Sequence, residues 1–460
     1  MSTIPLGTQF IGLASTVNTV ERRSSLINNE SAPYTMQDII DTVGGGLEGT
    51  QYVFVAADGT DVQNAAELQA AYVTAQSMSP SATNRITVIA APGNYNFGST
   101  TFVMNTQYID LVSLDGNRSV VFNSANTGGT ISITANDVFV KGVDVVSKNF
   151  SIANLLNLLR VENCSGGDNS FGGGGGSGTA SGTFTNCIGG LGSFGGSGIA
   201  NGTFTSCIGG LGSFGAYNLA SGVFTNCTGG GDSFGGLGGT ASGTFTSCTG
   251  GDASFGAYGA ASGTFTSCTG GDFSFGAYNL ASGTFTSCTG GSDSFGGSGT
   301  ASGTFTSCTG GDASFGGGGT ASGTFTNCTG GYASFGGAGG TASGVFNSCI
   351  GGGESFGAYN LASGVFTNCS GGDDSFGAYG AASGVFTNCT GGFASFSGSG
   401  TASGTFTSCT GGNFSFGGDG GTLNGKLYYC RLTSGSFEIV TSPGITRLCI
   451  DGNNVENNQG

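Results

Sequence analysis

Positive charge is what this sequence of 460 residues most conspicuously lacks. Only 8% of its residues are charged, and 26 acidic against 10 basic side chains give a net charge of −16. No lysine, arginine or histidine lies between Cys164 and Leu423. Because affinity for nucleic acids depends on clustered lysine and arginine, this composition excludes phosphate-directed nucleic-acid binding as an expected function.

Long apolar runs and paired metal ligands are also missing. No stretch of about 18 apolar residues is present, so no membrane-spanning helix and no membrane insertion are predicted. The start, MSTIPLGTQF, lacks a basic region followed by an apolar core, so no signal peptide is recognised. The cysteines form no CxxC pair. We therefore predict no metal site and no cofactor.

Glycine and phenylalanine are abundant, with 97 and 36 copies, and they recur in a fixed pattern. A block of about twenty residues, typified by ASGTFTSCTGGDASFGAYGA, carries a phenylalanine three residues before a cysteine and a Ser-Phe pair ending seven residues after it. Such self-similarity predicts a solenoid in which one block is one coil. The cysteines that mark the blocks are Cys164, Cys187, Cys207, Cys227, Cys248, Cys268, Cys288, Cys308, Cys328, Cys349, Cys369, Cys389 and Cys409.

Alternation within a block predicts which side chains point inward. In ASGTFT, the alanine, glycine and phenylalanine share one face, and serine and threonine share the other. We expect the Gly-Gly pair to form a corner at positive φ and Ser-Phe to begin a third short strand, so that a coil contains two or three strands. Burying each phenylalanine contributes about 1.5–3 kcal/mol. The predicted structural ladder includes Phe265, Cys268, Phe275, Phe285, Cys288 and Phe295.

The cysteine column permits two interpretations. Stacked neighbours would lie about 4.8 Å apart, within the range that a disulfide allows. Parallel side chains in a ladder have an unsuitable torsion for that bond, so buried free thiols that act as small hydrophobes are favoured.

Composition changes divide the chain into four regions. Residues 1–50 are predicted to be an attachment or assembly arm, with a capping box at residues 35–38 that opens a short helix; a partly disordered leader is the alternative. Residues 51–163 are predicted to form irregular coils, with a helix over 66–75 that covers the first hydrophobic cross-section and hides a sheet edge. Residues 164–421 form the regular coils, and residues 422–460 a C-terminal cap that stops further stacking.

The order DGTD, helix, ITVIAAPGNYNF and finally VFVKGVDVV, over roughly residues 50–165, resembles right-handed parallel β-helix proteins of the pectin-lyase-like superfamily. The resemblance implies an all-β, single-stranded, right-handed parallel β-helix, and we expect roughly sixteen to twenty coils. The terminal strings GTQFIGL, APYTMQDIIDTV, LYYCRLTSGSF and LCIDGNNVENNQG resemble phage and viral tail-fibre or structural proteins with Gly-rich repeats. This second likeness implies a virion-associated or extracellular fibre, often a homotrimer, that contacts a host surface.

The superfamily also contains polysaccharide lyases and hydrolases, so catalysis is an alternative. Lyases of this fold pair a basic residue with calcium-binding carboxylates, and the repeat array has no basic residue. Glycoside hydrolysis needs two carboxylates about 5–9.5 Å apart, and Asp373 and Asp374 with Glu354 are the candidate catalytic or calcium-binding residues. The competing interpretation is that the acidic residues keep the chain soluble. Those that recur after Gly-Gly are Asp252, Asp272, Asp293, Asp312, Glu354, Asp373 and Asp374.

Two surface columns are candidate binding sites. An exposed tyrosine column could stack on a sugar ring or pack against a neighbouring chain, although the absence of tryptophan weakens the glycan interpretation. Outward Thr-x-Thr files resemble the arrays of β-helical ice-binding proteins, although threonine is also a common outward strand residue and valine interrupts one file. The candidates are Tyr217, Tyr258, Tyr278, Tyr359 and Tyr379, and Thr264, Thr266, Thr284 and Thr286.

The sequence therefore predicts a non-enzymatic structural or adhesive fibre subunit, located in a virion or outside the cell. Its expected partners are further copies of itself, as a trimer or filament, and a host-surface glycan. An ice-binding protein and a polysaccharide-degrading enzyme are the alternatives.

Overall fold

The computed structural model describes residues 9–12, 51–126, 129–146, 150–152, 156–172, 178–337, 339–418, 420–435, 445–451, 453 and 456–459. Over these residues the chain is an all-β parallel β-solenoid of about 17 turns, with coils of about 20 residues and one helix near the N-terminus. The winding is right-handed. The predicted fold class is thus confirmed. The predicted helix after residue 35, and most of the predicted arm, lie outside the described residues.

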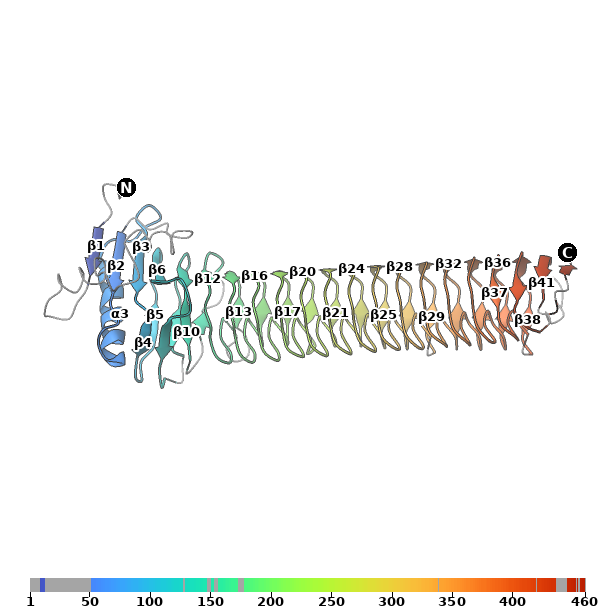
Figure 1. The fold of residues 1–460 in the computed structure, drawn as a ribbon, viewed down its shortest axis with the longest axis horizontal. Coiled ribbons are helices and arrows are strands. Elements are labelled where there is room, and N and C mark those ends of the chain that lie inside the picture. Colours follow the sequence, from blue (N-terminus) through green and yellow to red (C-terminus); the bar gives the residue numbers. More distant parts are fainter. Residues whose placement is uncertain are drawn as a thin grey trace. The chain divides into compact units, whose positions relative to one another are not determined.

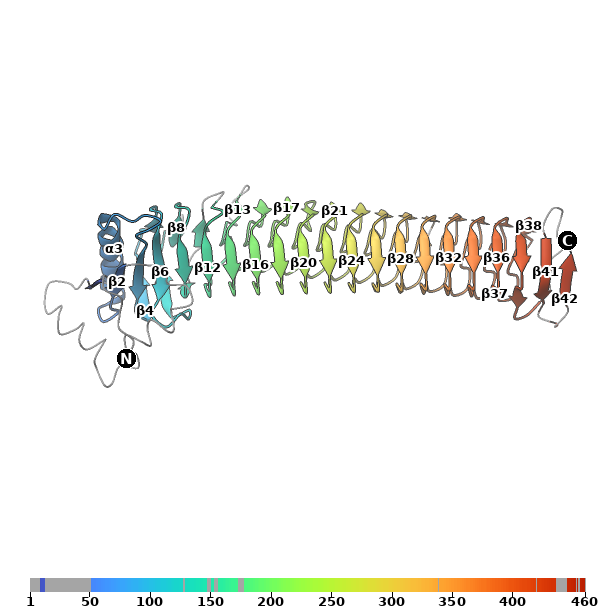
Figure 2. The ribbon, with the colours of Figure 1, turned by 90° about the horizontal axis from the view of Figure 1, so that it is seen from above.

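Contacts divide the chain into two compact units. The N-terminal unit comprises Met1–Gly215 with Asn226–Thr228, and the C-terminal unit comprises Ala216–Thr225 with Gly229–Gly460. Figure 1 and Figure 2 show successive strands of each unit lying side by side.

Three strands form each irregular coil of the N-terminal unit. One sheet runs through β2, β3, β6, β9, β12, β14 and β16, a second through β4, β7 and β10, and a third through β5, β8 and β11, all in parallel. The bounds are β1 Gln9–Gly12, β2 Gln51–Val55, β3 Ile86–Ala90, β4 Gly93–Asn96, β5 Phe102–Met104, β6 Ile109–Ser113, β7 Val120–Asn123, β8 Ile131–Ile133, β9 Phe139–Lys141, β10 Val143–Val145, β11 Phe150–Ile152, β12 Arg160–Glu162, β13 Thr179–Ala180, β14 Thr183–Thr185, β15 Ile199–Ala200 and β16 Thr203–Thr205.

The helix α3 spans Asp61–Ser77, and it begins before the predicted residue 66 because a capping box precedes it. The backbone N–H of Gln63 donates to the Thr60 hydroxyl, and the N–H of Thr60 donates to the Gln63 side chain. Leu68 and Tyr72 are buried where the helix packs against β4, β2 and β3. At the N-terminal end of the long sheet, β1 pairs with β2, and α3 packs against β4, the first strand of the second sheet.

Each regular coil of the C-terminal unit has only two strands, followed by an isolated bridge such as Thr269 with Thr289. Side chains along these strands alternate between buried and exposed as predicted, with Phe265 buried and Thr264 exposed. The bounds are β17 Leu219–Ala220, β18 Val223–Thr225, β19 Thr240–Ala241, β20 Thr244–Thr246, β21 Ala260–Ala261, β22 Thr264–Thr266, β23 Leu280–Ala281, β24 Thr284–Thr286, β25 Thr300–Ala301, β26 Thr304–Thr306, β27 Thr320–Ala321, β28 Thr324–Thr326, β29 Thr341–Ala342, β30 Val345–Asn347, β31 Leu361–Ala362, β32 Val365–Thr367, β33 Ala381–Ala382, β34 Val385–Thr387, β35 Thr401–Ala402 and β36 Thr405–Thr407.

Two phenylalanine columns fill the interior of these coils. Phe265 and Phe285 stack with ring centroids 4.8 Å apart and planes 3° apart, and the Ser-Phe column repeats this spacing. The two columns meet edge to face, with 5.7 Å between the Phe265 and Phe275 centroids at 90°. Stacking along the axis and edge-to-face contact across it are both favourable geometries for aromatic rings.

The corners of the coil differ from the prediction. The Gly-Gly pair does not adopt positive φ; Ser267, Phe273 and Phe275 do, at 54°, 56° and 54°. Ser-Phe is accordingly a turn and not a third strand. Glycine is required at Gly270 for lack of space, because a Cβ there would lie 2.6 Å from the Cβ of Ser274.

All fifteen cysteines are buried free thiols, as the favoured interpretation predicted. The thiol of Cys268 donates to the carbonyl oxygen of Phe245, one coil away, at 3.4 Å. Burial raises the pKa of Cys164 to about 12. A buried thiol of this kind is protonated and acts as part of the apolar core.

At the C-terminal end, Leu427 takes the place of the column phenylalanine, and a final antiparallel pair ends the parallel stacking. The bounds are β37 Thr410–Gly411, β38 Thr422–Leu423, β39 Lys426–Tyr428, β40 Arg431–Leu432, β41 Ile445–Ile450 and β42 Glu456–Gln459.

Candidate functional surfaces

The broad sheet of the C-terminal unit presents a surface without charge, which we call the sheet face. The sheet face consists of the outward residues of the even-numbered strands β18 to β36 and of the isolated bridge residue that follows each strand. All of these residues are threonine, serine, valine, asparagine or isoleucine. Thr264 pairs in register with Thr284, and Thr266 pairs with Thr286. Unbroken Thr-x-Thr pairs extend over five strands, β20 to β28. The four predicted threonines therefore lie together on one regular face.

In four coils, valine replaces the first threonine of the outward Thr-x-Thr pair. These side chains are 44–47% exposed, so they are outward like the threonines they replace. Threonine and valine differ by a hydroxyl in place of a methyl group, and both leave the face uncharged. The valines are Val223, Val345, Val365 and Val385.

A second surface, which we call the turn edge, consists of the residues around each Ser-Phe pair. Here the internal repeats differ from one another: the position that is Phe273 in one coil is Ala253, Asp293 or Glu354 in others. All of these residues adopt positive φ between 52° and 56°. Because alanine occupies the same backbone conformation, the fold does not require the acidic or aromatic side chains found at this position.

The five predicted tyrosines all lie on the turn edge and are 43–57% exposed. Tyr258 and Tyr278 stack with centroids 4.8 Å apart, and Phe273 lies 5.5 Å from Tyr278 in a nearly parallel plane. Tyr359 and Tyr379 form a second stack at 4.9 Å. Within each stack the two rings cover one another's facing sides, and sugar stacking on this column stays a prediction. The remaining tyrosine, Tyr217, lies next to no other tyrosine of the column.

Tyr332, which lies outside the predicted tyrosine column, is 50% exposed on the turn edge beside the second stack. A hydrogen bond with the carboxylate of Glu354 raises the pKa of Tyr332 to about 12. The same carboxylate raises the pKa of Tyr359. Glu354 thus acts on two phenols from neighbouring coils.

Several acidic residues of the turn edge join one coil to the next. The backbone N–H of Ser292 donates to Asp272 at 2.7 Å, that of Tyr332 to Asp312 at 2.7 Å and that of Phe393 to Asp373 at 2.7 Å. One oxygen of Asp373, a predicted catalytic candidate, is therefore used in coil packing. Among the described residues, no group of three or more metal-ligating side chains could hold a metal ion.

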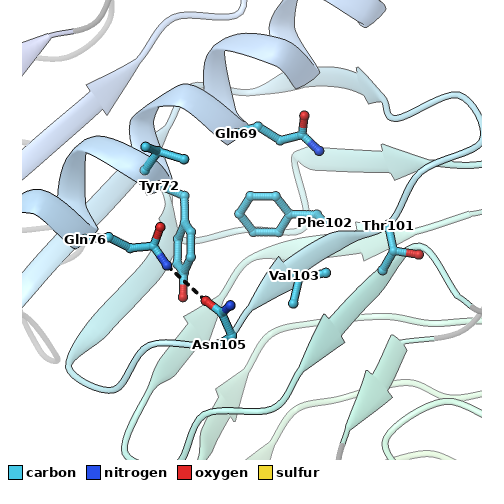
Figure 3. Close-up of a pocket in the computed structure, with 8 residues that line it drawn as sticks. Gln69, Tyr72, Gln76, Thr101, Phe102, Val103 and Asn105 are labelled. Carbon is cyan, nitrogen blue, oxygen red and sulfur yellow. Dashed lines mark hydrogen bonds between the residues drawn. The ribbon is translucent and has the colours of Figure 1, made fainter.

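The N-terminal unit has a hollow of about 310 Å³ between α3 and β5 (Figure 3). The rings of Tyr72 and Phe102 line it, and the side-chain amide of Gln76 donates to the amide oxygen of Asn105 at 2.9 Å across one end. Gln69 adds another amide to a lining that has no charged side chain. Apolar rings with amides suit a neutral ligand, and no pattern in the sequence indicates this hollow.

A buried ion pair also lies in the N-terminal unit. The guanidinium of Arg85 donates to both carboxylate oxygens of Asp110, at 2.7 and 3.0 Å, and to Asp137 at 2.9 Å. The backbone N–H of Phe139 donates to Asp110 as well, at 2.7 Å. This network joins three successive coils and gives both oxygens of the Asp110 carboxylate a hydrogen bond.

No family model and no curated protein matches the chain. Among solved structures, the A-module of the Azotobacter vinelandii mannuronan C-5 epimerase AlgE6 matches 84% of this chain and 95% of its own, with 10% identity and a TM-score of 0.19. A match this weak says nothing about function. No helix within the described part of the chain is long and apolar enough to cross a membrane.

Proposed function

We propose that this protein is a structural and adhesive subunit of a fibre, in which copies of the chain pack together through the sheet face. The fibre belongs to a virion or to another extracellular structure, a location that rests only on the resemblance of the terminal segments. The observation that carries the proposal is the separation of surface residues in the C-terminal unit. Carboxylates and aromatic rings lie on the turn edge, and none lies on the sheet face.

Physical chemistry favours the sheet face as the contact. Depletion of charged residues distinguishes the core of a protein interface from the rest of a surface. A net charge of −16 makes copies repel one another unless their charged edges point apart. Packing sheet face against sheet face achieves that orientation, because the acidic residues then lie outside the contact.

The test is the number of chains per particle, measured by light scattering after size-exclusion chromatography. We expect Thr264→Lys combined with Thr304→Lys to dissociate the assembly, because an ammonium group would be buried without a partner. The matched control is Ser298→Lys, which adds the same group on the turn edge and leaves assembly intact. Unchanged assembly in both variants would contradict the proposal.

Ice binding is the second candidate, and it is favoured by the in-register Thr-x-Thr pairs of β20 to β28. It requires the sheet face to be free in solution, so it competes with self-packing. The test is thermal hysteresis of the purified chain, with Thr264→Tyr and Thr266→Tyr abolishing it and Ser298→Tyr leaving it unchanged. A chain without hysteresis would remove this candidate.

A further inference from the structure

The turn edge of the C-terminal unit carries a feature that the proposed function does not use, namely two clusters that combine exposed aromatic rings with carboxylates. The first contains Tyr258, Tyr278 and Phe273, and Asp293 in the next coil acts electrostatically on Tyr278. The second, around Glu354, contains Tyr332, Tyr359, Tyr379 and Asp374.

We propose that these two clusters are a docking surface for an extended polypeptide segment that carries two arginines. Arginine suits both halves of each cluster, because its planar guanidinium pairs with carboxylates and also stacks on aromatic rings. Lysine offers only a compact charge and lacks this planar fork. The proposal does not depend on the proposed function, because the sheet face is a different surface.

Charge complementarity selects a cationic partner. The sequence from Cys164 to Leu423 contains no basic residue, so the turn edge has a field of one sign. Coils repeat every 4.8 Å in this unit, and the Debye length at physiological salt is about 8 Å. Carboxylates in adjacent coils therefore act together on an approaching cation.

The spacing of the clusters sets the spacing of the arginines. Four coil steps of 4.7–4.9 Å separate the coil of Tyr278 from that of Tyr359, which is about 19 Å. An extended chain advances about 3.3 Å per residue, so about six residues span this distance. Because six is an even number, both arginines would project from the same side of the extended segment.

The experiment measures fluorescence anisotropy of labelled Gly-Ser peptides titrated with the full chain. One peptide carries two arginines about six residues apart, and another of the same composition carries them side by side. We expect the spaced peptide to bind more tightly. Glu354→Gln and Asp293→Asn should each weaken its binding about fivefold, the upper range for an exposed ion pair.

Controls separate this surface from general attraction between opposite charges. Asp168→Asn removes one carboxylate charge in the N-terminal unit while keeping an oxygen that can accept the N–H of Leu191, and it should leave binding unchanged. Tyr359→Leu removes an exposed ring without changing charge and should weaken binding. Three results would overturn the proposal: equal affinity for both peptides, an equal effect of Asp168→Asn and Glu354→Gln, or tighter binding of a glucosamine oligomer than of the spaced peptide.

Discussion

The irregular coils of the N-terminal unit contain three strands and a varied core, whereas the regular coils of the C-terminal unit contain two strands and one repeated core. In the first unit, Ile86, Leu111 and Val140 occupy successive coils of one sheet, and Arg85 joins neighbouring coils through specific ion pairs. In every regular coil of the second unit the same phenylalanine, alanine and cysteine recur.

This difference shows what repetition makes possible. When every coil has the same interior, an outward residue can change without affecting the packing beneath it. The turn edge therefore varies between alanine, aspartate and phenylalanine at one backbone position, while the sheet face stays uniform. In the N-terminal unit a change in one coil requires matching changes in its neighbours.

The largest effect is expected from the repeated core. Phe285→Ala should lower the free energy of unfolding by about 4 kcal/mol, because it opens a cavity in both phenylalanine contacts. Phe265→Ala and Phe305→Ala should cost nearly the same, since their surroundings are identical. Urea unfolding measures this, with Phe393→Ala, whose ring is 45% exposed, as the control. Widely different costs at the three buried sites would contradict the equivalence of the coils.

A somewhat smaller effect is expected from the ion pairs of the N-terminal unit. Arg85→Met should cost about 3 kcal/mol, because it leaves the buried Asp110 carboxylate without its cation. Adding Asp110→Asn should recover part of that loss by removing the uncompensated charge. Urea unfolding of the single and double variants tests this, and a double variant less stable than Arg85→Met would be the contrary result.

The regular coils could be predicted from the sequence because identical residues at a constant spacing indicate that successive blocks stack on one another. The inward phenylalanines and cysteines followed from alternation and spacing, and the structure places Phe265, Cys268 and Phe275 in the core. The corners could not be predicted, because propensity assigns positive φ to glycine. Here Phe275 adopts positive φ, and its ring lies in the interior. Gly270 is needed because the neighbouring Ser274 side chain leaves no space for a Cβ.

The surfaces were harder to predict. Alternation placed Thr264 outside, but it gave no orientation for the tyrosine rings, of which Tyr258 with Tyr278 and Tyr359 with Tyr379 cover one another's faces. The contact of Tyr332 with Glu354 joins different positions of two successive coils, so no single block contains it. The hollow beside Tyr72 depends on how α3 packs, which periodicity does not describe.

A third prediction concerns the hydrogen bonds between coils. Asp312→Ala should cost about 1 kcal/mol, because the backbone N–H of Tyr332 loses its acceptor. Asp312→Asn keeps an oxygen there and should cost less than half as much. Chemical unfolding of both variants measures the difference, and equal costs would show that this hydrogen bond contributes nothing measurable.

The smallest effect is expected from pH and has opposite signs in the two units. Burial and the nearby Asp272 and Asp312 raise the pKa of Asp293 above 3.8. The contribution of Asp293 to stability is therefore fully present below its pKa in the unfolded chain. That contribution is lost as the pH rises through its pKa in the folded chain. Burial acts to raise the pKa of Asp115, but hydrogen bonds led by that from Ser119 lower it overall. Its contribution is present above the unfolded pKa and is lost as pH falls through the folded one.

Comparing unfolding midpoints at about pH 5 and about pH 3 separates these contributions. In the parent chain, acidification should raise the unfolding midpoint through Asp293 and lower it through Asp115. Asp293→Asn should remove the first change, and Asp115→Asn should remove the second. A shift of the same sign in both variants would contradict the assignment.

Electron microscopy of the purified chain tests the sheet face as the contact between copies most directly. The account predicts particles in which several solenoids lie side by side with their sheet faces together and their turn edges outward. Isolated single chains, or assemblies joined through the turn edges, would contradict it.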